Sequence, residues 1–228
     1  MESAEAPPPS PWRLVAWLGF VSALAALGYA SRFSDADPPE DLAYRYSSSV
    51  AAVVQYGIML AILLLIARGL PLRDAFGLHR PASWLRALGY ALLALAAIYV
   101  AGYVYVLLSG TDPTDEQGLV PNEWDPDRAG AFVAFLVAVS VVAPIVEELT
   151  YRGLGFSLLR PYGAWVAILV TGILFGAAHG LVEALPVLTV FGLAVGWLRA
   201  RTASVYPSMI LHGFFNGLAL IVSVSGAG

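Results

Sequence analysis

Long apolar stretches, separated by short polar segments, dominate the pattern along this chain of 228 residues. A helix that crosses a bilayer needs about 20 apolar residues, because each residue advances the helix by about 1.5 Å. The pattern therefore predicts an all-α fold, a polytopic transmembrane helix bundle with about seven spans. The predicted spans are residues 12–30, 48–67, 84–108, 130–150, 162–180, 184–198 and 204–225.

The polar segments suggest a division of the chain into three regions. Residues 1–11 (MESAEAPPPSP) are predicted to be a disordered tail, residues 12–125 carry the N-terminal membrane helices, and residues 126–228 carry spans with polar interruptions. The first apolar run is longer than the core of a signal peptide, which favours a retained anchor. The fourth span is expected to continue towards Arg160, with a bend at Pro144.

The distribution of arginine predicts the orientation in the membrane. Nine arginines lie at the N-terminus and in the even-numbered loops, against three in the odd-numbered loops. The positive-inside rule then places the N-terminus in the cytoplasm and the C-terminus outside. The odd loops 31–47 and 109–129 are rich in Asp, Glu and Pro. No spacing in them matches an EF-hand, so we interpret their acids as solvated surface charge rather than a calcium site.

Composition excludes several classes of chemistry. The chain is 59% hydrophobic and 12% charged, and it contains no cysteine, so disulfides and thiolate catalysis are excluded. All twelve basic residues are arginine, which excludes a lysine Schiff base and a P-loop lysine. The net charge of −4, without a basic cluster, argues against a nucleic-acid partner.

Two adjacent acids, Glu147 and Glu148, interrupt the fourth span, and Arg152 follows them. Ionised groups inside a membrane are costly and usually functional. Glu148 and Arg152 are spaced i, i+4, so an ion pair between them would neutralise one acid. Glu147 lies about 100° around the helix without a local partner, which makes it the candidate general base. The alternative, a structural Glu–Arg clamp, does not explain the second acid.

Two later spans carry polar pairs that are also spaced i, i+4. Phe175 and His179 occur in FGAAH, after small residues that let another backbone approach closely, and Phe175 is expected to shape a pocket wall. His212 and Asn216 occur in HGFFN, and their N–H groups could stabilise an oxyanion. The alternative for each pair is polar contact between helices.

Taken together, EELTYR, FGAAH and HGFFN resemble the EExxxR, FxxxH and HxxxN signatures of the CPBP family, which includes CAAX prenyl endopeptidases and bacterial Abi and bacteriocin-processing proteins. The resemblance covers about the last hundred residues. It implies an intramembrane glutamic endopeptidase that hydrolyses peptide bonds of membrane-associated proteins. It also implies catalytic roles for Glu147, Glu148, Arg152, His179, His212 and Asn216.

By this resemblance Glu147 activates water with help from His179, and His212 and Asn216 stabilise the oxyanion. Glu148 and Arg152 support the site. A zinc-dependent version is an alternative, with Glu147, His179 and His212 as ligands, since two His and a carboxylate can hold zinc. We favour a mechanism without a cofactor, because HExxH is absent and the family is usually regarded as glutamate-dependent.

Two further classes remain open from the sequence. One is a non-catalytic membrane scaffold or immunity protein of the Abi type, and the other is a small transporter with a proton relay, for which inverted repeats are lacking. The Lys-free, Ala-, Leu- and Arg-rich composition suggests a bacterial inner-membrane protein. The expected partners are the lipid bilayer and a membrane-associated protein or peptide substrate.

Overall fold

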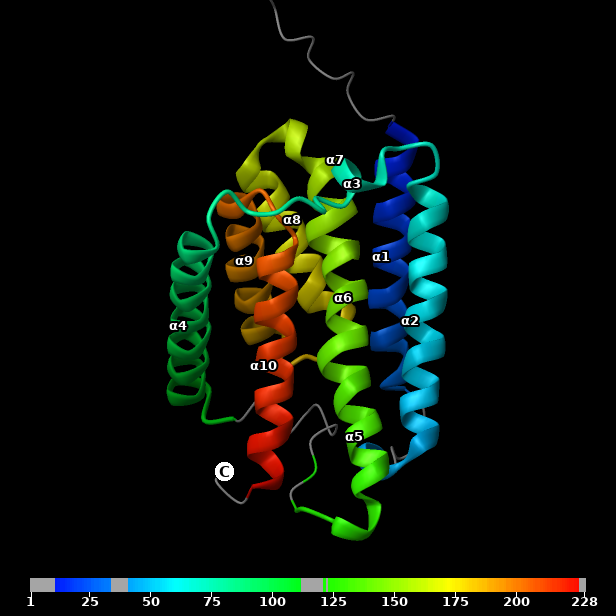
Figure 1. Ribbon diagram of the computed structural model, residues 1–228, viewed down its shortest axis with the longest axis vertical. Coiled ribbons are helices and arrows are strands. Elements are labelled where there is room, and N and C mark those ends of the chain that lie inside the picture. The colour runs from blue at the N-terminus through cyan, green and yellow to red at the C-terminus, as the bar shows by residue number, and fades with distance from the viewer. Residues whose placement is uncertain (1–10, 34–40, 112–120, 122, 226–228) are drawn as a thin grey trace, which may run out of the picture.

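The computed structural model describes residues 11–33, 41–111, 121 and 123–225, so the tail predicted for residues 1–11 lies outside the described residues except for Pro11. The described part is a bundle of helices without a β-strand (Figure 1). The helices before the long interrupted region are α1 (Pro11–Ser31), η1 (Leu42–Tyr44), α2 (Tyr46–Ile66), α3 (Leu72–Ala75) and α4 (Trp84–Ser109). The helices after it are α8 (Ala164–Ala178), α9 (Leu185–Thr202) and α10 (Tyr206–Val224).

Between these two groups, one helical stretch runs from Pro126 to Tyr162. It consists of η2 (Pro126–Arg128), α5 (Ala129–Val137), the π-helical η3 (Ala138–Val142), α6 (Ala143–Glu148), the π-helical η4 (Leu149–Gly155), α7 (Phe156–Leu159) and η5 (Arg160–Tyr162). We call it the long helix. It confirms that the fourth predicted span continues past the two acids to Arg160.

Seven helical stretches, counting the long helix as one, occupy the seven predicted segments within the described residues. Five of them are long and apolar enough to cross a membrane: α1, α2, α4, the long helix and α10. Helix α8 has only 15 residues, about 22 Å, which is short of a bilayer core of about 30 Å. The chain is therefore a multi-pass, all-α integral membrane protein, as predicted.

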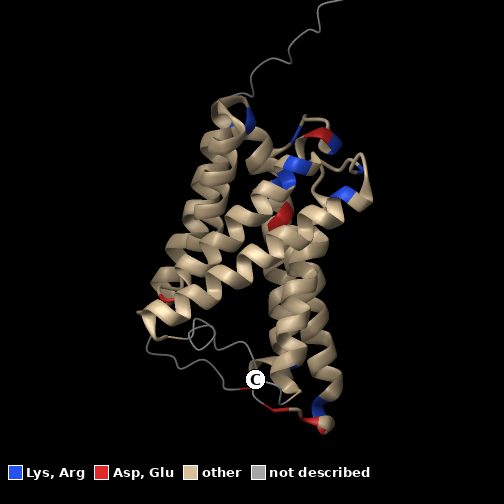
Figure 2. Cartoon of the chain, turned by 90° about the vertical axis from the view of Figure 1, so that its left-hand side faces the viewer, with Lys and Arg blue, Asp and Glu red and all other residues tan. Residues whose placement is uncertain are grey.

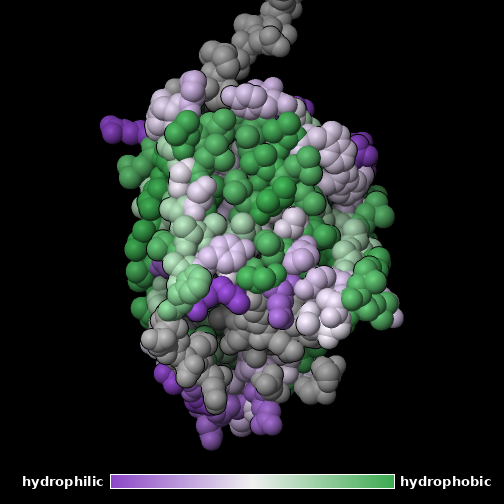
Figure 3. Space-filling model, turned by 180° about the vertical axis from the view of Figure 1, so that it is seen from behind, coloured by the Kyte–Doolittle hydropathy of each residue, from purple (hydrophilic) through white to green (hydrophobic). Residues whose placement is uncertain are grey.

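The outer surface of the bundle is apolar. Large apolar side chains such as Leu85, Leu93 and Leu108 of α4 are exposed, as expected for residues that contact lipid. Figure 3 shows apolar residues over most of the upper and middle surface seen from behind, with hydrophilic residues gathered towards the lower end. The packed core lies between the helices and includes Trp17 of α1 and Phe175 of α8.

The long helix is π-helical over Ala138–Val142 and returns to α-helical geometry at Ala143, immediately before Pro144. A proline has no N–H, so the carbonyl of Ser140, four residues earlier, loses its usual helical donor. Helix α10 lies against this carbonyl: a Cβ atom on Gly213 would come within 2.4 Å of the Ser140 oxygen. Glycine at position 213 therefore permits the close packing that brings α10, with His212, onto the long helix.

Helices α8 and α9 pack backbone against backbone. A Cβ atom on Gly172 would lie 2.9 Å from the backbone nitrogen of Leu193, and one on Gly176 would lie 3.0 Å from that of Thr189. The expectation that the small residues of FGAAH permit a close backbone approach is therefore confirmed. Because α8 is held this closely, the FxxxH motif on it has a fixed position beside the long helix.

The charged residues lie mainly at the two ends of the bundle, and most arginines lie at one end (Figure 2). Arg152 is an exception: it is fully buried inside the long helix rather than in a loop, so its count as a loop charge was wrong. At the opposite end, Arg128 pairs with Asp125 at 2.5 Å and with Asp41 at 2.6 Å. A hydrogen bond from Arg45 lowers the pKa of Asp41, and one from Arg128 lowers that of Asp125. These two acids thus serve as exposed ion-pair partners.

Candidate active site within the bilayer

The centre of the site is the ion pair between Glu148 and Arg152. Nη1 of Arg152 lies 2.9 Å from Oε1 of Glu148, and both side chains have no exposed surface. Nη2 of Arg152 donates to the carbonyl oxygen of Gly192 in α9 at 2.8 Å. The guanidinium also lies 4.5 Å above the ring of Phe175. The predicted i, i+4 pair is confirmed, and it ties the long helix to α8 and α9.

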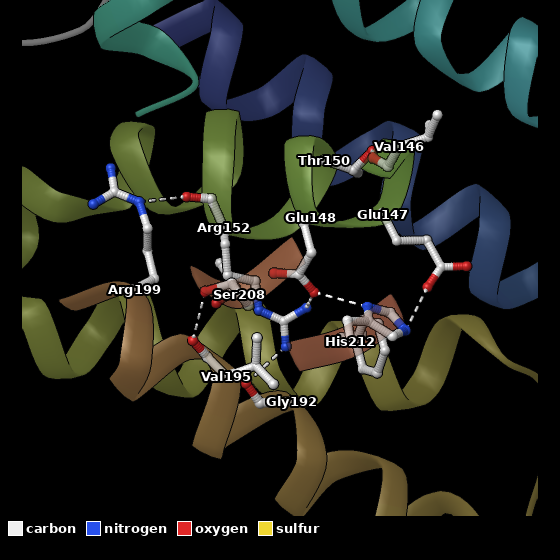
Figure 4. Close-up of polar contacts among 12 residues, drawn as sticks. Val146, Glu147, Glu148, Thr150, Arg152, Gly192, Val195, Arg199, Ser208 and His212 are labelled. Carbon is white, nitrogen blue, oxygen red and sulfur yellow. Dashed lines mark hydrogen bonds and ion pairs between the residues drawn. The ribbon is translucent and has the colours of Figure 1, made fainter. Parts of the chain in front are cut away.

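His212 of α10 lies between the two carboxylates (Figure 4). Its Nδ1 atom is 3.0 Å from Oε1 of Glu148, and its Nε2 atom is 3.6 Å from Oε2 of Glu147. The first distance is a hydrogen bond, whereas the second is too long for one. Since Nδ1 is held by Glu148, the orientation of the ring is fixed and Nε2 is directed towards Glu147.

Glu147 has a different environment from its neighbour. Its side chain is 13% exposed, whereas that of Glu148 is fully buried. The hydroxyl of Tyr56, on α2, donates a hydrogen bond to Oε1 of Glu147. Glu147 has no ion-pair contact with Arg152, in agreement with the prediction that it lacks a local cation; its partners come from α2 and α10. Of the two carboxylates, it is the one with exposed surface.

His179 lies one side chain away from this cluster. Its Nδ1 atom is 2.8 Å from the carbonyl oxygen of Phe175, and its ring packs against the Phe175 ring at 4.8 Å. The Phe175 ring also packs against His212, with ring centroids 5.5 Å apart. Among the described residues, His179 pairs with neither glutamate, and a direct contact with Glu147 is absent. Phe175 thus packs against both histidines, and its expected place in a pocket wall stays a prediction.

Asn216 is on the same face of α10 as His212, but its amide is used elsewhere. Its Nδ2 atom donates to the carbonyl oxygen of Val139, in η3, at 3.1 Å. A π-helical turn leaves carbonyl groups without their usual helical donor, and Asn216 supplies one. Asn216 therefore joins α10 to the long helix one turn from His212 and the two acids. Its oxyanion role stays a prediction.

The second π-helical segment is stabilised from outside the long helix. Trp17 of α1 donates its indole N–H to the carbonyl of Thr150 at 2.9 Å, and Nε of Arg199 in α9 donates to the carbonyl of Arg152 at 3.0 Å. Both acceptors lie in η4, and such wide turns occur frequently at functional sites. The backbone that carries Arg152 is thus held from two sides.

The three ligands of the zinc alternative are not assembled. Over the part of the chain that the structure describes, no group of three or more His, Asp or Glu side chains could hold a metal. His179 is turned to the backbone of its own helix, and His212 is engaged by Glu148. Glu147, His179 and His212, as they stand, do not fit a zinc ion.

Four contributors to the site were not identified from the sequence: Tyr56, Trp17, Arg199 and Gly192. Tyr56 is an isolated hydroxyl in an apolar span, and a buried tyrosine usually finds a polar partner, so its position was a usable signal. Arg199 was counted only as a charge for orientation. Gly192 contributes its backbone carbonyl, for which the sequence carries no signal.

Comparison with known proteins agrees with this geometry. Residues 129–218 match the family model described as type II CAAX prenyl endopeptidase Rce1-like. The matched segment lies inside the predicted region 126–228, although the division of the chain into regions stays a prediction. The chain is also 26% identical over 214 residues to "Putative membrane peptidase YdiL" of Bacillus subtilis, covering 89% of this chain and 84% of that protein.

No solved structure matches the chain. The two sequence matches confirm the resemblance to CPBP-family membrane proteases that the three motifs carried. In general terms they support a CAAX-type protease embedded in the membrane.

Proposed function

We propose that this protein is an intramembrane endopeptidase in which Glu147 activates a water molecule for attack on a peptide bond of a membrane-associated protein. The observation that carries the proposal is the asymmetry of the two acids. Glu148 is fully buried and neutralised by Arg152, while Glu147 is partly exposed and contacted by Tyr56 and His212. One carboxylate is thus structural, and the other is available to accept a proton.

In this mechanism Glu147 removes a proton from water as the water oxygen attacks the peptide carbonyl. His212 presents its Nε2 atom to the reacting carbonyl, because its Nδ1 atom is hydrogen-bonded to Glu148. With His212 protonated, two carboxylates, one guanidinium and one imidazolium sum to zero net charge, which suits a buried cluster. The Nε2–H group then faces the developing oxyanion. Glu147 returns its proton to the leaving amine.

The geometry supports a different task for each histidine than the motifs alone implied. His212 is adjacent to Glu147, whereas in the described part of the chain His179 contacts Phe175, which packs against His212. We therefore assign the direct partnership with Glu147 to His212. We assign to His179 the positioning of Phe175, whose ring also supports Arg152 and His212.

The experiment that tests the proposal compares protein N-termini in membranes that contain either the wild-type protein or the Glu147→Gln variant at equal abundance. We expect a set of new N-termini, located in or beside membrane segments, that only the wild-type protein produces. Identical sets of N-termini in the two membranes would favour the alternative of a non-catalytic scaffold or immunity protein.

We further propose a cytoplasmic N-terminus in a bacterial inner membrane. Most arginines lie at the end of the bundle where α1 begins (Figure 2), and removing Arg152 from the loop count still leaves eight against three. Reporter fusions to the two termini test this orientation: the N-terminal fusion should be active in the cytoplasm and the C-terminal fusion outside.

Replacing Tyr56 by phenylalanine should lower kcat about ten- to a hundredfold, because a hydrogen bond to a charged group contributes about 1.5–3 kcal/mol. The ring of Tyr56 remains, so stability should change little. Tyr103→Phe on the exposed face of α4 is the matched control. An unchanged kcat in Tyr56→Phe would remove Tyr56 from the site.

We propose catalysis without a metal, and purified active protein should then contain negligible zinc. Chelators should leave peptide cleavage unchanged, because Glu147, His179 and His212 are not arranged as ligands. Elemental analysis and activity after dialysis against a chelator are the measurements. About one zinc ion per chain, with chelator inactivation that zinc reverses, would require the zinc-dependent version instead.

A further inference from the structure

An apolar groove of about 640 Å³ opens on the side of the bundle between α2 and α10. Leu60 and Leu64 of α2 form one wall, Met209 and Ile210 of α10 form the other, and Ile145 of the long helix lies on the floor. These walls are almost entirely apolar. Ligand pockets for small molecules have volumes of about 300–1,000 Å³, so the groove is large enough for an elongated apolar ligand.

A second, polar pocket of about 560 Å³ lies at the arginine-rich end of the bundle. Arg73, Arg80 and Trp84 line it, together with Leu78 and Tyr206. Both arginines and Trp84 are exposed, and the lining contains no acidic residue. The nearest acid along the chain, Asp74, pairs with His79 at 2.9 Å. The charge of this pocket is therefore positive.

The two pockets are neighbours that share lining residues. Leu78 and Tyr206 belong to both, so the apolar groove ends where the cationic pocket begins. A ligand that fills both has an apolar chain and an anionic head. Trp84 and Tyr206 are the residue types that occupy the level of lipid headgroups in membrane proteins. A ligand of this shape and charge is an anionic phospholipid.

From this continuity we propose that the protein carries a specific site for one anionic phospholipid of the bilayer. The phosphate binds between Arg73 and Arg80, and an acyl chain lies in the groove between α2 and α10. Arginine is well suited to the phosphate, because its guanidinium offers several N–H donors in a planar fork. This lipid site does not depend on the proposed peptidase activity.

The groove also includes residues of the two helices that bring His212 next to Glu147 and Glu148. Ile145 and Leu149 belong to the long helix, on either side of Glu147 and Glu148 in sequence. Gly213 of α10, which packs against the Ser140 carbonyl, also lines the groove. A bound acyl chain therefore packs against the two helices whose contact places His212 beside the acids. The lipid should stabilise that contact.

The test measures lipid binding directly, with full-length protein purified in mild detergent and exposed to equal amounts of phosphatidylglycerol and phosphatidylcholine. Native mass spectrometry should detect one retained phosphatidylglycerol and little phosphatidylcholine. Phosphatidylglycerol should also raise the temperature of unfolding, since a ligand that binds only the folded state stabilises it. Equal retention of the two lipids would overturn the proposal.

The double variant Arg73→Gln/Arg80→Gln should bind phosphatidylglycerol about thirtyfold more weakly, from the attraction of each arginine to an anionic headgroup. Arg86→Gln/Arg160→Gln is the matched control, because it removes two exposed arginines that do not line the pocket. If both double variants lose binding equally, the attraction is that of the whole surface, and a specific site is refuted.

The groove is tested separately from the arginines. Leu64→Trp places a large ring in the groove and should displace the lipid, while Leu108→Trp, on the exposed face of α4, should not.

Soluble glycerol phosphate should bind much more weakly than the lipid. If glycerol phosphate binds as well as the lipid, the pocket is a site for soluble anions. If groove residues crosslink to substrate peptide and no lipid binds, the groove is a substrate path. Either result overturns the proposal.

Discussion

Replacement of Glu147 by glutamine is expected to reduce peptide cleavage by about 10²- to 10⁴-fold, the range typical for loss of a general base. Glutamine has the same shape, and its carbonyl oxygen can still accept the hydrogen bond from Tyr56. It cannot accept the proton of the attacking water. The fold should therefore persist while kcat collapses. The measurement is kcat/KM on a defined peptide with purified protein in lipid nanodiscs.

Two companion variants make the interpretation of Glu147→Gln specific. Glu123→Gln changes an exposed acid at the far end of the bundle and should leave cleavage unchanged. Glu147→Asp keeps a carboxylate on a shorter side chain and should retain more activity than Glu147→Gln. The unfolding temperatures of all three should match that of the wild-type protein within a few degrees. Near-normal turnover in Glu147→Gln would refute the assignment of the base.

Much of the fold could be predicted from hydrophobicity alone. The apolar runs located α1, α2, α4 and α10 to within two residues at each end, because a bilayer imposes a minimum length on each spanning helix. The short helix α8 shows where this reasoning weakens. It was predicted as residues 162–180 and ends at Ala178, and 15 residues cannot span the apolar core. One face of α8, with Ile168 and Phe175, is buried against other helices, while apolar side chains such as Trp165 and Leu169 are exposed.

The site was predictable where it is local in sequence. Glu148 and Arg152 lie four residues apart on one helix, so helical geometry sufficed to predict their contact. His212 and Tyr56 reach the acids from other helices, and their distances depend on helix packing. That packing depends on particular atoms, such as the missing N–H of Pro144 and the missing Cβ of Gly213. The hydrophobic pattern contains no information about either effect.

The π-helical segments explain the remaining differences. In η3 the carbonyl of Val139 is available to Asn216, and in η4 the carbonyl of Arg152 is available to Arg199. In a regular α-helix, backbone N–H groups of the same helix would donate to these carbonyls. The residue pattern therefore did not indicate that Asn216 donates to the Val139 carbonyl or that Arg199 donates to the Arg152 carbonyl. Both contacts depend on backbone geometry, and the oxyanion role of Asn216 stays a prediction.

Replacement of Arg152 by alanine should destabilise the protein by about 3–5 kcal/mol, because it leaves Glu148 buried without its cation. The variant also lacks the hydrogen bond to the Gly192 carbonyl and the contact with the Phe175 ring. Helices α8 and α9 are therefore held less firmly to the long helix. We expect an unfolding temperature in detergent lower by about 10 °C or more. Activity should fall as well, since Glu148 orients His212.

The double variant Arg152→Ala/Glu148→Gln separates charge from packing. Glutamine at position 148 removes the unpaired charge, so part of the lost stability should return, whereas activity should stay low because Nδ1 of His212 loses its carboxylate partner. Arg160→Ala, an exposed arginine eight residues further along the same helix, is the control and should unfold like the wild-type protein. If Arg152→Ala unfolds at the wild-type temperature, the ion pair contributes nothing to stability. The division of labour between the two acids would then have to be abandoned.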